Sequence, residues 1–120
     1  PLVIPTREGP VVGVLDDGVR AWLGIPYAAP PEGELRFAAP APPLCRTSPL
    51  VANQFKAVCP QRGDGNEIVG AEDCLTLNIW SPVEIQAPLP VLIFIHGGAH
   101  MQGSASKAIA AGEPLYDGRF

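Results

Sequence analysis

The chain has 120 residues, of which 47% are apolar, and its formal net charge at neutral pH is −4. This apolar content excludes an intrinsically disordered chain, and the length is enough for one small domain. The acidic balance and the lack of a Lys/Arg cluster argue against nucleic acid or an anionic membrane surface as a partner, and no apolar run reaches the roughly 18 residues of a membrane span.

The first 25 residues predict a small antiparallel sheet. Residues 2–5 are a short apolar strand candidate, and segments 9–15 and 19–25 flank Asp16-Asp17-Gly18, a turn sequence that tolerates left-handed backbone conformations. The two segments are therefore expected to form a β-hairpin. Beyond it, prolines between positions 26 and 49 prevent a long helix, so irregular coil is expected up to about Asn53.

Three cysteines occur, at positions 45, 59 and 74. Cys59 and Cys74 are 15 positions apart, and a bond between them would stabilise the fold by about 3 kcal/mol on a chain-entropy estimate. The alternative is a reduced pair that packs as small apolar side chains. An oxidised pair favours a secreted or periplasmic location, and a reduced pair favours the cytoplasm. The spacing contains no C-x₂-C pair, so no zinc site is expected.

Two strands are predicted in the second half of the chain. Residues 75–80 alternate apolar and polar side chains and favour β structure. Residues 91–95 are a continuous apolar run, which is typical of a strand buried on both faces of a parallel sheet. The short connection between the two suits neighbouring strands of one sheet. Only one short helix candidate, 106–112, is visible, so the chain looks incomplete as an α/β domain.

A pair of glycines follows the second of these strands, in the sequence His96-Gly97-Gly98-Ala99. Small residues at the end of a strand leave backbone N–H groups open to a ligand and tolerate unusual φ and ψ values. The pattern resembles the oxyanion-hole loop of α/β-hydrolases, although a Gly-Gly pair is also typical of a plain turn. His96 and His100 share one face only in a helix, which the glycines would break, so no metal site is expected.

Four separate stretches occur in an order that one known family shares. They are Gly24-Ile25-Pro26-Tyr27-Ala28, Leu35-Arg36-Phe37, Glu72-Asp73-Cys74-Leu75-Thr76-Leu77-Asn78-Ile79-Trp80 and His96-Gly97-Gly98-Ala99, with a weaker fifth at 113–118. In this order they resemble the type-B carboxylesterases, the cholinesterase-like branch of the α/β-hydrolases, and most of all the bacterial para-nitrobenzyl esterases among them. The resemblance implies an α/β fold in which a small antiparallel sheet leads into strands of a large, mostly parallel central sheet. Residues 1–120 would be the amino-terminal portion of one such domain, incomplete alone.

The resemblance also implies structural roles for two pairs of side chains. Arg36 and Glu72 would form an ion pair that ties the proline-rich coil to the start of the strand at 75–80, and Cys59 would bond to Cys74. A buried Arg–Glu pair usually fixes geometry more than it adds net stability. Cys45 matches nothing in the family pattern and is expected to be a free thiol.

The same resemblance implies a chemical role for residues 97–101. The N–H groups of Gly98 and Ala99 would donate to the oxyanion of a tetrahedral intermediate, and Gly97 would shape the loop so that both point the same way. Ala99 stands where many relatives carry a third glycine. His100 replaces a common phenylalanine. His100 and Met101 either line the substrate pocket or face solvent.

Members of this family hydrolyse carboxylic esters with a triad of Ser, His and Glu or Asp, whose serine lies in a Gly-x-Ser-x-Gly turn. No serine of this chain has such flanking glycines, so the triad is expected outside it, and His96 is interpreted as a loop-shaping residue. The predicted function is hydrolysis of a small-molecule carboxylic ester without a cofactor, and it requires the carboxyl-terminal remainder of the protein, either continuous with this segment or as a second chain. This segment alone is expected to be inactive. The alternative is a catalytically inactive cholinesterase-like binding or adhesion domain.

Overall fold

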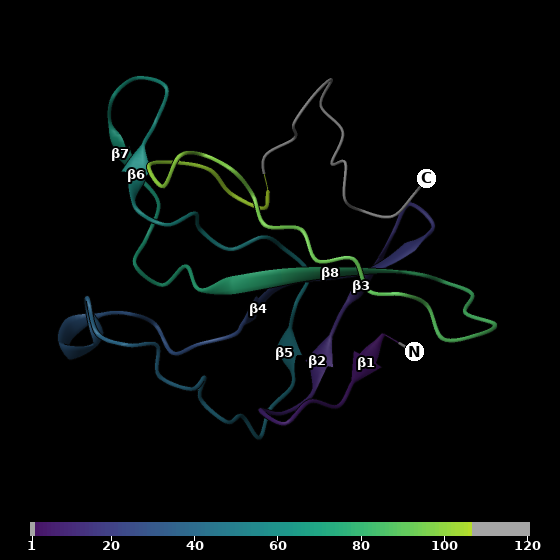
Figure 1. Cartoon of the computed structure of the whole chain (residues 1–120). Helices are drawn as coiled ribbons and strands as arrows, with labels where there is room; N and C mark the ends of the chain where they lie inside the picture. Colours follow the sequence, from purple (N-terminus) through teal and green to yellow (C-terminus); the bar gives the residue numbers. More distant parts are fainter. Residues whose placement is uncertain (1, 107–120) are drawn as a thin grey trace.

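The computed structural model describes residues 2–106, which form two three-stranded sheets and a separate two-stranded hairpin (Figure 1). In chain order the elements are β1 (Val3–Ile4), β2 (Val11–Val12), β3 (Val14–Asp16), β4 (Val19–Pro26), the 3₁₀ turn η1 (Gly33–Leu35), β5 (Leu50–Val51), β6 (Gln61–Arg62), β7 (Ile68–Val69) and β8 (Thr76–Pro82). In the part that the structure describes, no helix has the length and apolar character needed to cross a membrane.

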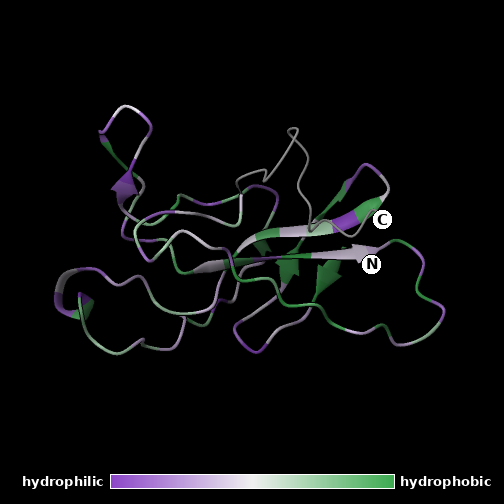
Figure 2. Ribbon diagram, turned by 45° about the horizontal axis from the view of Figure 1, so that its top comes forward, coloured by the Kyte–Doolittle hydropathy of each residue, from purple (hydrophilic) through white to green (hydrophobic). Residues whose placement is uncertain are grey.

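The first sheet consists of three short strands in the order β1-β2-β5. β1 pairs with β2 antiparallel, and β2 pairs with β5 parallel. All the residues of these strands are apolar and mostly β-branched, which favours extended structure, and Figure 2 shows the strands in the hydrophobic colour. Val11 in β2 and Ala52, directly after β5, are each only 1% exposed. This sheet therefore contributes a large part of the small core.

The predicted hairpin is confirmed by the pairing of β3 with the start of β4. Asp16 lies opposite Val19 in an antiparallel ladder. Between them, Asp17 (φ 42°) and Gly18 (φ 84°) both have positive φ, as a two-residue turn between right-twisted strands requires. The Asp17-Gly18 turn is thus sufficient to predict where β3 ends and β4 begins.

The second sheet has the order β3-β4-β8, and the predicted strand at 75–80 is confirmed as β8. β4 and β8 run antiparallel along most of their length, with an irregular register between Trp22 and Ile25. Gly24, inside this irregularity, has φ 74°, and its N–H donates to Asn78 Oδ1 at 2.8 Å. The glycine therefore permits a bulge, and the asparagine side chain replaces the ladder bond lost there.

Both sheets contribute to one cluster of buried side chains. Val11, Trp22 and Ala52 pack together, and the indole Nε1–H of Trp22 donates to the carbonyl oxygen of Leu2 at 2.9 Å. The Leu23 N–H donates to the Ala52 carbonyl at 3.0 Å and so links β4 to the end of β5. A buried indole needs such a partner, because an unsatisfied N–H in an apolar core is costly.

The proline-rich segment between β4 and β5 is irregular, as predicted. Its only regular element is η1 (Gly33–Leu35). The Ala29 N–H donates to the Ala41 carbonyl at 2.9 Å, which closes the long excursion near its base.

The apolar run at 91–95 is not the buried strand that was predicted. It belongs to no ladder among the described residues, and four of its five side chains are at least 80% exposed. β8, the expected neighbour, pairs instead with β4. Consecutive strands can pair in parallel only when a long crossover connects them, and the connection between Pro82 at the end of β8 and residue 91 is too short for one. The segment instead runs outside the described sheets toward the β6–β7 hairpin (Figure 1). The predicted helix at 106–112 lies outside the described residues, apart from Ser106.

Candidate active site

The loop after the apolar run folds back on itself. Gly98, Ala99 and His100 have φ values of 133°, 54° and 59°. The carbonyl oxygen of Gly98 accepts the N–H groups of Met101 (3.0 Å) and Gln102 (3.2 Å). Successive non-glycine residues with positive φ are uncommon, and such strained conformations concentrate at active sites and ligand-binding loops.

Two adjacent backbone amides at the head of this turn have no acceptor in the described part of the chain. Within residues 2–106, the N–H groups of Gly98 and Ala99 donate to no carbonyl or side chain. Gly98 is half-buried and Ala99 is exposed. Successive amides in a turn of this kind form an anion-binding concavity, and they can stabilise an oxygen on which negative charge develops.

Steric contacts explain why two positions of the loop hold glycine. A Cβ added at Gly98 would collide with the carbonyl oxygen of Gln102, and a Cβ added at Gly103 would collide with that of Gly97. Both positions also have positive φ, 133° and 125°. A Cβ added at Gly97, in contrast, would meet no described atom within 4 Å. Gly98 and Gly103 are therefore required by the turn itself, whereas Gly97 leaves open space beside it.

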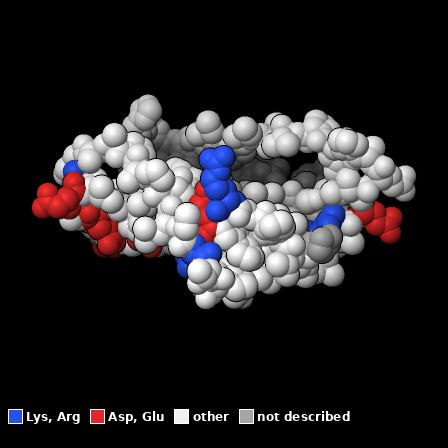
Figure 3. Space-filling view, turned by 90° about the horizontal axis from the view of Figure 1, so that it is seen from below, with Lys and Arg blue, Asp and Glu red and all other residues white. Residues whose placement is uncertain are grey.

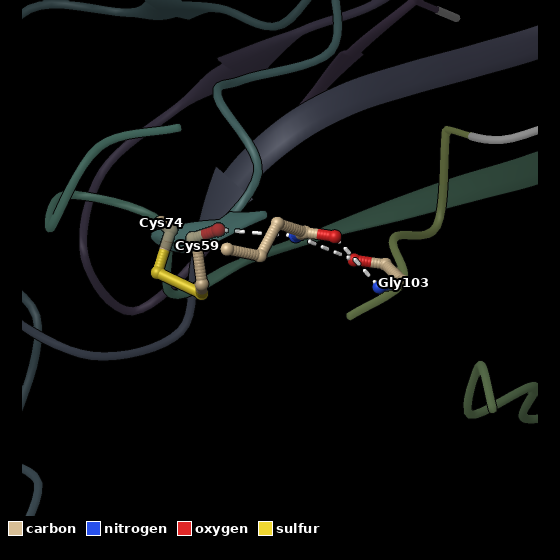
Figure 4. The surroundings of a disulfide bond; sticks show 4 residues. Cys59, Cys74 and Gly103 are labelled. Carbon is tan, nitrogen blue, oxygen red and sulfur yellow. Dashed lines mark hydrogen bonds between the residues drawn. A yellow bond between two sulfur atoms is a disulfide. The ribbon is translucent and has the colours of Figure 1, made fainter. Parts of the chain in front are cut away.

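A single glutamine from the β6–β7 hairpin holds the end of this loop. The Gly103 N–H donates to Gln61 Oε1 at 2.7 Å, and Gln61 Nε2 donates to the Gly103 carbonyl at 3.0 Å. Gln61 Nε2 also donates to the Cys59 carbonyl at 3.0 Å, and Figure 4 shows this arrangement beside the disulfide. Sequence reasoning missed this contact, because an isolated glutamine carries no motif and its partner is 42 positions away.

The disulfide between Cys59 and Cys74 is confirmed. Its sulfurs are 2.03 Å apart, and its Cα atoms are 5.0 Å apart. It encloses the β6–β7 hairpin, and the Ala71 N–H donates to the Val58 carbonyl at 2.9 Å just outside β7. Cys45 is a free, exposed cysteine.

Arg36 and Glu72 form an ion pair, with Arg36 Nε 2.7 Å from Glu72 Oε1. The pair is partly exposed rather than buried, with 54% of the arginine side chain and 37% of the glutamate side chain accessible. The Arg36 guanidinium also lies 5.6 Å from the centroid of the Phe37 ring. Because Glu72 comes just before Cys74, the pair ties the turn at η1 to the disulfide. An exposed pair of this kind contributes about 0–1 kcal/mol.

The remaining predicted residues of the loop lie on its surface. His96 Nδ1 lies 2.8 Å from the carbonyl oxygen of Gly97, so this ring contacts the backbone of its own loop. His100 and Met101 are exposed, Met101 to 74%. Among the described residues, no three His, Cys, Asp or Glu side chains gather where they could hold a metal ion. The loop therefore offers backbone donors rather than a cluster of titratable side chains.

A separate apolar hollow of about 290 Å³ lies on the sheets. Side chains of β1, β2, β4 and β8 line it, together with Thr6 and Ile85, and no residue of segment 96–106 takes part. Figure 3 shows one face of the molecule, which is mostly uncharged, with acidic side chains mainly toward its two ends. Because no residue of segment 96–106 lines it, the hollow is distinct from the loop that carries the Gly98 and Ala99 amides.

Comparison with known proteins identifies the family. The sequence model of the carboxylesterase family matches residues 1–118. The chain is 40% identical over 122 residues to the para-nitrobenzyl esterase of Bacillus subtilis (strain 168), covering 97% of this chain and 24% of that protein. It is 41% identical over 122 residues to the fumonisin B1 esterase of Sphingopyxis macrogoltabida, covering 98% and 21%.

The solved structures agree with the sequence relatives. A thermophilic PNB esterase matches with a TM-score of 0.82 at 41% identity, covering 97% of this chain and 24% of that chain. The chain thus spans about a quarter of the length of the relatives it matches. It belongs to the carboxylesterase family, and its strands correspond to the amino-terminal part of that family's α/β-hydrolase fold.

Proposed function

We propose that this chain supplies the oxyanion-hole loop of a serine carboxylesterase that hydrolyses small carboxylic esters. The N–H groups of Gly98 and Ala99 donate to the substrate oxygen, and the catalytic serine, histidine and acidic residue come from the remainder of the protein. One observation carries the proposal: two adjacent amides without a described acceptor lie at the head of a strained glycine turn. The esterase names of the two relatives support the same reaction class.

The proposed loop acts when the serine oxygen attacks the ester carbonyl carbon. The carbonyl electron pair moves onto the oxygen, which becomes an oxyanion, and the two amides donate to it together with a third N–H after the serine. When the carbonyl re-forms, the alcohol leaves with a proton from the general acid, and water then hydrolyses the acyl-enzyme through a second tetrahedral intermediate. Each donor is worth about 3 kcal/mol of barrier.

The chemical character of the loop suits a neutral ester. Residues 96–106 contain no Asp, Glu, Lys or Arg, so the donors next to the substrate are dipoles rather than full charges. A dipole aimed at a carbonyl oxygen interacts more strongly with the charged intermediate than with the neutral ground state, which is the requirement for catalysis. The proposal therefore assigns this chain to stabilisation of the intermediate, not to proton transfer.

The test uses the complete protein that carries these residues, or this chain co-expressed with the carboxyl-terminal remainder. We expect it to release p-nitrophenol from p-nitrophenyl acetate and butyrate, and replacement of the serine in the Gly-x-Ser-x-Gly turn by alanine should abolish this release. An intact serine turn without turnover would refute the enzyme assignment. A substituted turn would instead favour the binding or adhesion domain.

A further inference from the structure

We infer that Gln61 is the positioning residue of the oxyanion-hole loop: its side-chain amide pairs with both backbone groups of Gly103 and holds the loop against the disulfide-bonded hairpin. This inference rests on the proposed function of the loop. Gln61 touches neither the substrate nor the reacting atoms, and it acts through the backbone that carries the Gly98 and Ala99 amides.

The pairing uses both N–H donors and the oxygen of the Gln61 amide. Oε1 accepts the Gly103 N–H at 2.7 Å, and the two Nε2 protons go to the carbonyls of Gly103 and Cys59, both at 3.0 Å. The side chain exchanges two bonds with one residue, as a neighbouring strand would at a hydrogen-bonded pair. Gln61 therefore holds Gly103 by the same kind of paired bonds that a neighbouring strand would supply.

The backbone that carries Gln61 is fixed by strand pairing and by a disulfide. Gln61 belongs to β6, where it lies opposite Val69 of β7, and the hairpin is closed by the Cys59–Cys74 bond. The third hydrogen bond, to the carbonyl of nearby Cys59, orients the Gln61 amide from the side of the hairpin. The side chain thus extends from a cross-linked hairpin rather than from a free loop (Figure 4).

Gly103, which Gln61 holds, lies close to Gly97, the residue before the two proposed donor amides. Gly103 approaches Gly97 so closely that an added Cβ would collide with the Gly97 carbonyl. The position of Gly103 is therefore closely fitted to the residue that precedes the Gly98 and Ala99 amides. Within residues 2–106, both hydrogen bonds that join segment 96–106 to the rest of the chain belong to Gln61. Loss of this side chain would leave the position of the amides without that support.

The kinetic test compares Gln61→Ala with Gln86→Ala in the complete protein, because Gln86 is an exposed glutamine in the connection after β8. Rates are normalised to active sites titrated with an organophosphate. We expect Gln61→Ala to lower kcat by about 10- to 100-fold, since a misplaced donor loses much of its effect, while KM changes less than about threefold. Gln86→Ala should match the wild type.

Two further measurements separate positioning from a general structural role. A trifluoromethyl ketone forms an oxyanion with the serine, so its affinity should fall in parallel with kcat, whereas a non-reacting alcohol analogue should bind equally well. Gln61→Glu keeps the acceptor for Gly103 but repels two carbonyls when ionised. Its activity relative to wild type should therefore rise as the pH falls from 8 to 5, since the protonated carboxyl regains a donor.

Hydrogen exchange provides a readout that does not require activity. In Gln61→Ala, amides of the peptide 97–103 should exchange faster than in the wild type, and those of β4 should not. Unchanged kcat per site, analogue affinity and exchange would overturn the role of Gln61 while the esterase assignment stands. Faster exchange in a protein that hydrolyses no ester would support the clamp and reject the proposed function. If Gln61→Ala does not fold, Gln61→Glu gives the same comparison through its pH dependence.

Discussion

The role assigned to the Ala99 amide predicts the effect of a single-atom change. Replacing Ala99 by lactic acid, through nonsense suppression, exchanges its N–H for an ester oxygen and keeps the methyl group. In the structure this N–H has no acceptor within residues 2–106, so its removal breaks no hydrogen bond among those residues. The substitution should therefore leave the fold intact and should remove one of the two donors that this chain supplies to the proposed oxyanion hole.

The magnitude follows from what one such donor is worth. Loss of an oxyanion-hole donor costs about 3 kcal/mol, so kcat should fall by roughly 100- to 1,000-fold. KM should change little, because the donor interacts mainly with the charged intermediate and only weakly with the neutral ester. The assay is p-nitrophenyl butyrate hydrolysis by the complete protein, with the concentration of active sites determined by titration.

A matched control removes a second consequence of the ester bond. The ester also weakens the Gly98 carbonyl as an acceptor, and this carbonyl closes the turn by accepting the Met101 N–H at 3.0 Å. The hydroxy-acid analogue of Met101 loses that turn bond and leaves the Ala99 N–H intact. A net hydrogen bond is worth about 1 kcal/mol, so this control should lose no more than about tenfold. Equal losses in the two proteins would refute the assignment of the Ala99 amide as an oxyanion donor.

The structure also predicts the results of three other experiments. Gly98→Ala should lower kcat by more than about 100-fold, because its Cβ would collide with the turn. Gly97→Ala should keep the thermal unfolding midpoint and should slow the hydrolysis of bulky acyl esters more than that of acetate. A larger loss of kcat in Gly97→Ala than in Gly98→Ala would contradict the steric account. Replacing Cys59 and Cys74 together by serine should lower the free energy of unfolding in urea by about 3 kcal/mol, and a loss below about 1 kcal/mol would contradict the chain-entropy estimate. A double-mutant cycle of Arg36→Ala and Glu72→Ala should give a coupling energy below about 1 kcal/mol, because both side chains are partly exposed; a value above about 2 kcal/mol would be inconsistent with that exposure.

The features that were predictable from sequence have local causes. The β3–β4 hairpin depends on Asp17 and Gly18, whose tolerance of positive φ is a property of the residues themselves. The coil around η1 follows from prolines that cannot continue a helix, and β8 follows from a period-two pattern. In each case the information lies within a few neighbouring residues, so no tertiary contact was needed.

The features that sequence reasoning missed depend on partners far away in the chain. The apolar run at 91–95 has the composition of a buried strand, but a strand is buried only when other segments pair with it and cover it, and among the described residues the run joins no sheet and stays largely exposed. β8 finds its neighbour in β4 rather than in the run that follows it. The Gln61 contact is equally non-local, and a glutamine in a two-residue strand carries no pattern that would indicate its partner.

The glycines of the loop show how local and non-local requirements combine in the candidate site. Gly98 and Gly103 are needed because the turn brings backbone oxygens where a Cβ would be, and a sequence can satisfy that need without any other part of the protein. A tight turn, however, fixes only the shape of the loop and not its place relative to a serine elsewhere. That place requires an external contact, and Gly103 provides one because it presents both of its backbone groups to Gln61. The same glycine thus fits closely against the Gly97 carbonyl at the end of the turn and connects the turn to the disulfide-bonded hairpin, so loop shape and loop position are coupled at a single residue.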